Sequence, residues 1–110
     1  MFEVHVFLGE GTVSAGNPLG FKPGGRHRVL VFVRRGAGAE HDLASATRRA
    51  EESGLIDVKL EKGGTVQPEA LGSLSPHLMG AYQRALKLGT GIIVYRQPLG
   101  PDGAATAPGA

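Results

Sequence analysis

Residues 27–34 read HRVLVFVR, and the unbroken apolar run from Val29 to Val33 is the strongest strand pattern in the chain. Side chains alternate between the two faces of a strand, so the three valines lie on one face and Leu30 and Phe32 on the other. A run that is apolar on both faces is typical of a strand buried within a sheet. The fold is therefore expected to be built around this strand.

The segments before this strand predict a second strand and a long loop. Residues 2–8 alternate strictly, with Phe7 on the same face as Glu3 and His5, which is the period of a half-buried strand. Residues 9–26 are rich in glycine and proline and show no clean periodicity. Long loops are usually either functional or mobile, so this one is expected to carry a site.

The segments after it predict two helices and several short strands. Gly63-Gly64 signals a hairpin, Ser75-Pro76 a helix start, and Gly89 a helix end. The expected elements are a helix over 40–53, a strand over 56–60, a return strand over 65–67, a helix over 76–88 and a strand over 91–96. The buried stripes of the helices are expected at Leu43, Ala46, Thr47 and Ala50, and at Leu78, Met79, Tyr82, Ala85 and Leu86.

The order of these elements predicts the fold class. From residue 27 onward it is strand, helix, strand, strand, helix, strand, the order of a ferredoxin-like two-layer sandwich. The sequence thus predicts an α+β fold of this type with an extra N-terminal strand. If residues 65–67 form only a loop, the alternative is a mixed sheet in which a β hairpin is followed by βαβ units. One domain is expected over 1–97, with a flexible tail over 98–110.

Two helices on one face of a sandwich would leave the other face of the sheet uncovered. Because the strand over 27–34 is apolar on both faces, we expect an exposed hydrophobic area. The 9–26 loop, the C-terminal tail or a second copy of the chain must cover this area, and symmetric pairing with a second copy is the commonest arrangement among soluble oligomers. The sequence therefore predicts a homodimer whose interface includes Phe7, Leu30 and Phe32.

The composition excludes several classes of protein. The 110 residues include no cysteine, which excludes disulfide frameworks and cysteine nucleophiles. No apolar stretch has the length of a membrane span and no signal peptide is recognisable, so a cytoplasmic location is expected. A net charge of only +2 and the lack of an aromatic RNA-binding strand argue against nucleic acid as a partner. No metal or cofactor is expected, because histidine pairs with ligand spacing and complete nucleotide-binding motifs are absent.

The positive charge is concentrated in one part of the sequence, since no acid lies between Glu10 and Glu40. The basic end of the 9–26 loop predicts a small anionic ligand. If His5 and His27 approach each other, with a carboxylate from Glu3 or Glu10, this site could also perform acid–base chemistry. The residues expected to bind this ligand are His5, Lys22, Arg26, His27 and Arg28.

A second candidate anion site lies at the start of the first helix, close to Arg34, Gly36 and Gly38. Free backbone amides at a helix start can hold an anion. Glu40 and Asp42 place negative charge at the same end of the helix and would repel a phosphate. A tight turn from strand to helix is the simpler interpretation.

Two classes of function stay open at this point. The first is a non-enzymatic binding or interaction module that acts as a homodimer. The second is a small-molecule site or enzyme, with an anionic ligand held under the 9–26 loop by His5, His27 and Arg28. A closed dimer face favours the first class, and a concave pocket under the loop favours the second.

Overall fold

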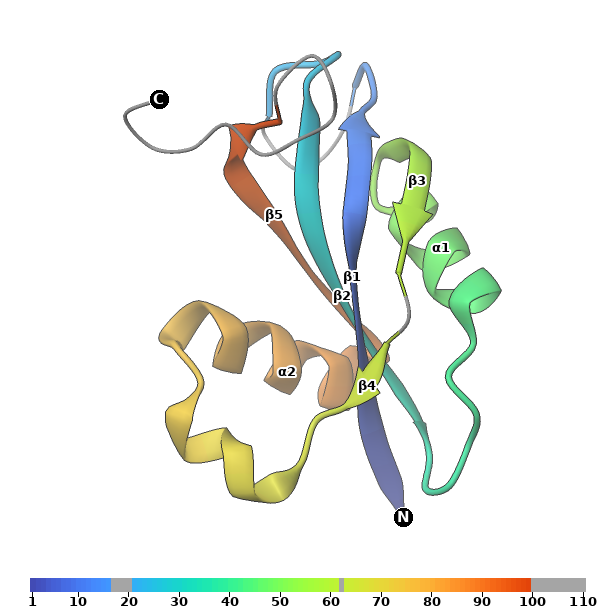
Figure 1. The fold of residues 1–110 in the computed structure, drawn as a ribbon, viewed down its shortest axis with the longest axis vertical. Coiled ribbons are helices and arrows are strands. Elements are labelled where there is room, and N and C mark those ends of the chain that lie inside the picture. The colour runs from blue at the N-terminus through green and yellow to red at the C-terminus, as the bar shows by residue number, and fades with distance from the viewer. Residues whose placement is uncertain (17–20, 62, 100–110) are drawn as a thin grey trace.

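The computed structural model describes residues 1–16, 21–61 and 63–99 of the chain (Figure 1). Within these residues, a five-stranded antiparallel sheet is combined with two α-helices and a short 3-10 helix. The α+β class expected from the sequence is confirmed. In chain order the elements are β1 (Phe2–Val13), β2 (Arg26–Gly36), α1 (Leu43–Glu52), β3 (Leu55–Leu60), β4 (Gly64–Thr65), η1 (Pro68–Ser73), α2 (Pro76–Leu88) and β5 (Thr90–Pro98).

The strand order is β3-β1-β2-β5, and β4 also pairs with β1. Every strand pairing in the described chain is antiparallel. β1 and β2 form a long hairpin, with Phe2 opposite Gly36 at one end and Thr12 opposite Arg26 at the other. The N-terminal strand thus lies inside the sheet instead of being added to a βαββαβ unit, and the ferredoxin-like order is not confirmed.

β1 continues to Val13, well beyond its expected end at Leu8. The expectation that a loop begins at Gly9 is wrong, because this glycine is part of the strand. A Cβ atom at Gly9 would overlap the carbonyl oxygen of Lys59 and would lie 2.7 Å from the Cα of Leu60. Glycine at this position therefore lets β3 pass close to β1.

The connection between β1 and β2 is shorter than the expected 9–26 loop and spans residues 14–25. Residues 17–20 of this connection lie outside the described part of the chain. The hairpin pairing extends past the end of β1, since the Val13 N–H donates to the carbonyl of Gly25 at 2.9 Å. Backbone pairing thus fixes both ends of the connection.

β3 and β4 pair with β1 and not with each other, so the hairpin expected at Gly63-Gly64 is wrong. β4 pairs with His5 and Val6, and β3 pairs with the second half of the same strand. A Cβ at Gly63 would lie 2.6 Å from the Phe7 ring and 2.6 Å from the carbonyl oxygen of Val6. This glycine lets the chain stay close to β1 as it passes from β3 to β4.

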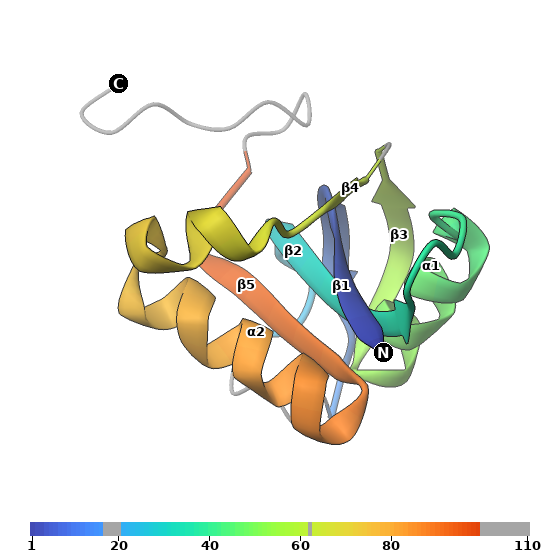
Figure 2. The ribbon, with the colours of Figure 1, turned by 90° about the horizontal axis from the view of Figure 1, so that it is seen from below.

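The two α-helices pack on opposite faces of the sheet, with α1 beside β3 and α2 beside β5 (Figure 2). Ala46 and Ala50 of α1 join the core cluster that holds the three valines of β2. Ala81 and Ala85 of α2 join the cluster that contains Phe32. The expectation that both helices cover one face is therefore wrong. The chain's own helices cover apolar side chains on both faces of β2.

The three residues expected at a dimer face belong to these two clusters. Phe7 is buried in the cluster on the α1 side, and Phe32 is buried in the cluster on the α2 side. Leu30 is half-buried against the same cluster as Phe32. Phe7 and Phe32 are thus covered within a single chain. A homodimer stays a prediction, but these two phenylalanines do not form an open surface for it.

α2 begins and ends at the expected signals, whereas α1 begins at Leu43, three residues later than expected. The Oδ1 of Asp42 accepts from the Ser45 N–H at 3.0 Å at the start of α1, and Gly54 follows the end of this helix. The Oγ of Ser75 caps α2, and Gly89 ends it in the left-handed conformation with φ of 99°. Local hydrogen bonding therefore sets the helix boundaries.

The expected burial of Ala46, Ala50 and Ala85 is confirmed, but two of the leucines expected beside them are not buried. Leu43 is 40% exposed and Leu86 is 37% exposed, so the prediction that both are core residues is wrong. The half-buried Leu78 and Tyr82 do pack against the cluster on the α2 side, as expected. Alanine at the contact lets a helix lie close to the sheet, and longer side chains then remain at the rim of the contact.

β5 continues to Pro98, and the Leu99 N–H donates to the carbonyl of Arg26 at 2.6 Å. The first two residues of the tail expected over 98–110 are thus paired with β2, and residues 100–110 lie outside the described part of the chain. Among the described residues, no helix has the length and apolarity needed to cross a membrane.

Candidate functional site

α2 rests directly on β5 at one point, where small residues permit the contact. A Cβ at Gly91 would overlap the carbonyl oxygen of Ala81 and would lie 3.1 Å from its Cα. Glycine is therefore required in the strand at this crossing. Beyond it, β5 rises away from α2 (Figure 1).

Two hollows lie between α2 and β5 beyond this crossing. One measures about 360 Å³ and the other about 330 Å³, and both are bordered by His77, Ile93 and Val94. We call the combined depression the α2–β5 groove; its walls are residues 75–84 of α2 with its cap and residues 92–96 of β5. The α2 wall is open at Gly80, where an added Cβ would meet no atom within 4 Å.

The backbone of β5 presents unpaired groups beside this groove. β5 is the last strand on its side of the sheet within the described chain. The Arg34 N–H donates to the carbonyl of Gly89 at 3.0 Å, and the register between β2 and β5 is unbroken from Thr90 to Val94. Because bonded and non-bonded pairs alternate along an antiparallel ladder, the N–H and C=O of Ile92 and Val94 point away from β2. Both residues border the groove.

Three basic side chains border the groove. His77 and Arg84 come from α2, and Arg96 comes from β5. Among the described residues, neither hollow is bordered by an aspartate or a glutamate. The potential in the groove is therefore suited to negative charge.

His5 is the buried member of a separate polar cluster with Glu3 and His41. It is 0% exposed, and its Nε2–H donates to Glu3 Oε2 at 2.5 Å. The ring of His41 lies 4.1 Å from that of His5 and is hydrogen-bonded to Thr65 Oγ1 at 2.9 Å. The bond from His5, together with the Gly38 N–H, lowers the pKa of Glu3 below its ordinary value. The cluster ties the segment before α1 to β1 and β4.

The two histidines that were expected to meet are not brought together. His27 pairs with Gly11 in the β1–β2 hairpin, six residues along β1 from His5, or about 20 Å. His27 is buried, and its Nδ1–H donates to the carbonyl of Tyr95 at 2.6 Å. Its ring packs against Phe21 with a centroid distance of 5.0 Å. The carboxylate expected beside His5 is present, but the pair of histidines is not.

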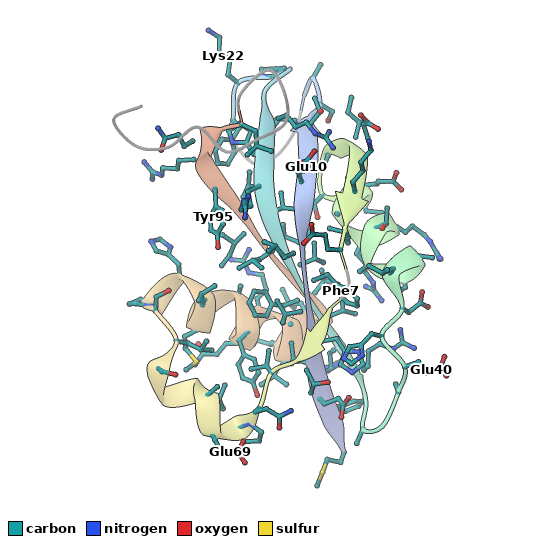
Figure 3. The ribbon with its side chains drawn as sticks, viewed as in Figure 1. Phe7, Glu10, Lys22, Glu40, Glu69 and Tyr95 are labelled. Atoms are coloured by element: carbon teal, nitrogen blue, oxygen red, sulfur yellow. The ribbon has the colours of Figure 1, made fainter. Side chains whose placement is uncertain are left out.

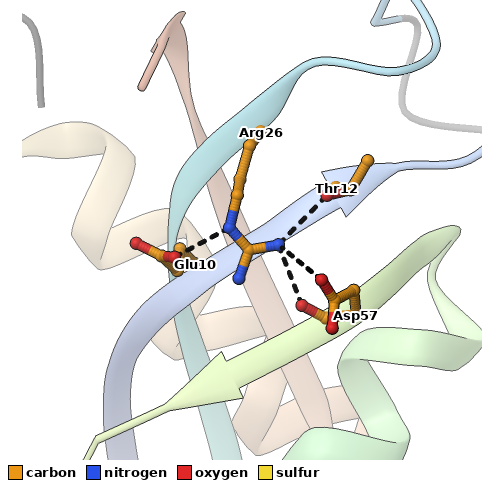
Figure 4. A network of polar contacts seen from close by, with 4 residues as sticks. All are labelled: Glu10, Thr12, Arg26 and Asp57. Carbon is orange, nitrogen blue, oxygen red and sulfur yellow. Dashed lines mark hydrogen bonds and ion pairs between the residues drawn. The ribbon is translucent and has the colours of Figure 1, made fainter. Parts of the chain in front are cut away.

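Arg26 is held in a polar network that links β1, β2 and β3 (Figure 4). Its Nε donates to Glu10 Oε1 at 2.7 Å, and its Nη1 donates to Thr12 Oγ1 at 3.0 Å and to the carbonyl of Asp57 at 2.9 Å. These hydrogen bonds engage most of the N–H donors of Arg26, so its role is structural. Arg28 lies opposite Glu10 in the hairpin, beside a hollow of about 230 Å³ that carboxylates also border.

Lys22 projects from the end of the molecule that lies opposite the N-terminus (Figure 3). It borders a further hollow of about 230 Å³ together with His27 and Arg96. Of the five residues expected to bind an anion, the structure therefore places only Lys22 and His27 beside one hollow. Arg96, which the sequence did not single out, joins them.

The residues expected to form an anion site at the first helix are not gathered there. α1 begins only at Leu43, and the Gly38 N–H donates to the Glu3 carboxylate. The Nη1 of Arg34 donates to the carbonyl of Leu86 at 2.7 Å, on the side of the sheet that α2 covers. Gly36 is the last residue of β2 and pairs with β1.

Comparison of the chain with protein family models, with curated proteins and with solved structures finds no match. Within the described residues, no group of three or more histidines, aspartates and glutamates is arranged to hold a metal ion. The function is therefore argued from the geometry of the chain itself.

Sequence reasoning missed the α2–β5 groove, because a free strand edge depends on the order of strands in the sheet. Two glycines were available as local signals. Gly91 lies at the start of an apolar strand and Gly80 lies inside a helix, and glycine weakens both kinds of element. Such glycines often mark the close approach of another segment or of a ligand.

Proposed function

We propose that this protein is a non-enzymatic binding module that takes an extended segment of a partner polypeptide as an additional strand along β5. The observation that carries this proposal is the outward-facing backbone of Ile92 and Val94 beside the α2–β5 groove. An extended peptide can form main-chain hydrogen bonds with such an edge and place alternate side chains in the adjacent groove.

The dimensions of the edge fit a short segment. The unbroken register from Thr90 to Val94 corresponds to about 17 Å of extended chain, enough to pair with about five residues of a partner. The opening at Gly80 leaves room for one side chain of the added strand, and Ile93 supplies an apolar floor.

A catalytic role for the groove has less support from its composition. In the described part of the chain, one histidine, His77, borders the groove, and no carboxylate borders it to orient that ring. The Ser75 hydroxyl accepts the Leu78 N–H as the cap of α2, at 3.3 Å. Binding without chemistry is therefore the function that these side chains support best.

A random twelve-residue peptide library displayed on phage tests the proposal directly. Peptides enriched on the wild-type protein should lose binding to Val94→Pro, which removes the outward N–H, and to Gly80→Leu, which fills the groove. Binding should persist with Gly72→Leu, a matched control in η1 where an added Cβ also meets no atom within 4 Å. Circular dichroism melts establish that each variant is folded.

Two results would overturn the proposal. The first is a library that yields no peptide whose binding depends on Val94 and Gly80. The second is a wild-type dimer in light scattering that Val94→Pro converts to a monomer, since a second copy of the chain would then occupy the edge.

A further inference from the structure

The hollow beside Lys22 shares Arg96 with the α2–β5 groove, but it lies on the other face of the sheet, since Phe21 in its wall packs against the cluster on the α1 side. Four basic side chains border these three hollows: Arg84, His77, Arg96 and Lys22. We call these four side chains the basic track. Among the described residues, no aspartate or glutamate borders any of the three hollows. Arg84, His77 and Arg96 thus lie beside the outward-facing backbone of β5, and Lys22 shares a hollow with Arg96.

The side chains of the basic track have no carboxylate partner among the described residues. Elsewhere in the chain, arginines are engaged: Arg26 pairs with Glu10, and Arg35 lies 3.7 Å from a carboxylate oxygen of Asp42. Lys22, Arg84 and Arg96 of the track are therefore cations without such a partner, and a bound anion relieves the repulsion among them.

The position of α2 adds to the positive potential of the track. His77 is in the first turn of this thirteen-residue helix, directly after Pro76, so the positive end of the helix dipole lies beside the groove. His77 and Arg84 are two helical turns apart, or about 10 Å. Residues two and four positions apart in an extended strand are separated by about 7 and 13 Å. The spacing of His77 and Arg84 lies between these two distances, and the flexible Arg84 side chain can reach either position.

We infer that the segment bound along β5 is acidic, with at least two aspartates or glutamates that face the basic track from positions two to four residues apart. This inference rests on the proposed function. A second copy of the chain fits the track poorly, because its own β5, TGIIVYRQP, contains Arg96 and no acid. Two copies of β5 side by side would add cations to an already basic surface.

The phage-selected peptides test this inference through their composition and their response to charge. Peptides whose binding depends on Val94 and Gly80 should contain more Asp and Glu than the unselected library. For the tightest synthetic peptide, exchange of each acid for its amide should weaken binding about two- to fivefold, as measured by fluorescence anisotropy. Raising the salt concentration from about 50 to about 500 mM should weaken it further.

Variants of the protein identify the cations involved. Arg84→Gln and Arg96→Gln should each weaken binding of the same acidic peptide about two- to fivefold, while its amide version binds both variants as it binds wild type. Arg48→Gln is the matched control, because Arg48 is exposed on α1 at the opposite face of the sheet. It should leave the affinity unchanged.

The outcomes separate this inference from the proposal on which it rests. If the peptides whose binding depends on Val94 and Gly80 are neutral or basic, the inferred acidic preference is wrong, but strand addition along β5 still stands. Acidic peptides that bind Val94→Pro and Gly80→Leu as tightly as wild type would overturn both, since charge alone would then attract them. A selection without any edge-dependent peptide would also overturn both.

Discussion

Two of the outer strands of the sheet, β3 and β5, differ in length, in exposed charge and in the regularity of their pairing. β3 has six residues, carries Asp57 and Lys59 at exposed positions, and has an irregular register with β1. Asp57 also adopts a φ of 50°, which is unusual for a residue other than glycine. β5 is longer, keeps regular pairing from Thr90 to Val94, and is apolar there.

Short length, charge and irregularity are the common means by which proteins prevent unwanted strand pairing. β3 has all three, so its outer edge is a poor template for another strand. β5 lacks them over its regular part and is flanked instead by an open groove. By these criteria the outer edge of β3 is protected against pairing, and the outer edge of β5 is open to a further strand.

The largest expected effect concerns the protected edge. Leu55 begins β3 and is fully buried in the cluster on the α1 side, whereas its neighbour Ile56 is 52% exposed. Leu55→Ala should lower the free energy of unfolding by about 2–5 kcal/mol, and Ile56→Ala by less than about 1 kcal/mol. Urea unfolding followed by circular dichroism measures both. Similar losses for the two variants would show that β3 does not bury the face described.

A smaller effect is expected where α2 meets β5. Gly91→Ala should destabilise the protein by about 1–3 kcal/mol, because the added methyl group overlaps the backbone of Ala81. Gly80→Ala, on the open wall of the groove, should instead stabilise it by about 0.5–1 kcal/mol through helix propensity. The same unfolding experiment applies. If Gly91→Ala were as stable as wild type, α2 would not rest on β5 at this point.

The smallest expected effect is on the pH dependence of stability, and it concerns the cluster of Glu3, His5 and His41 beside β4. The folded chain holds the pKa of Glu3 below its ordinary value, chiefly through the hydrogen bond from His5. The resulting stabilisation is complete above the ordinary glutamate pKa of about 4.3 and is lost as the pH falls through the lower pKa of the folded state. Between neutral and acidic pH, wild type should therefore lose more stability than Glu3→Gln.

The control for this measurement is Glu69→Gln, because Glu69 is exposed on η1 and has no hydrogen bond to another described residue. Its acid-induced loss of stability should equal that of wild type. Equal losses in wild type and Glu3→Gln would show that the cluster contributes nothing to the pH dependence.

Local signals in the sequence predicted the elements better than their packing. The apolar run of β2 and the caps at Ser75 and Gly89 depend on a few neighbouring residues, and all three were read correctly. Gly9 was misread, because its role depends on how closely β3 approaches, which is a property of the folded chain. Leu86 was misread because the alanines beside it allow α2 to lie close to the sheet.

The candidate site could not be predicted from neighbouring residues in the sequence, for a related reason. Charge predicted an anionic partner, and Lys22 does belong to the basic track, but Arg26 is held by Glu10 and is not available to it. The contribution of Arg84 and Arg96 appears only when α2 and β5 lie side by side. That arrangement follows from the strand order, which the sequence pattern does not specify.

The position of β2 between β1 and β5 has a consequence for synthesis on the ribosome. β1 and β2 are adjacent in the chain, and hairpins of this kind form in about 1–10 μs. β5 is the last described element, and at about 5–20 residues per second it is translated seconds after β2. During those seconds the nascent hairpin carries Leu30 and Phe32 on an unpaired edge of β2. That edge is the segment a chaperone has most reason to cover before release.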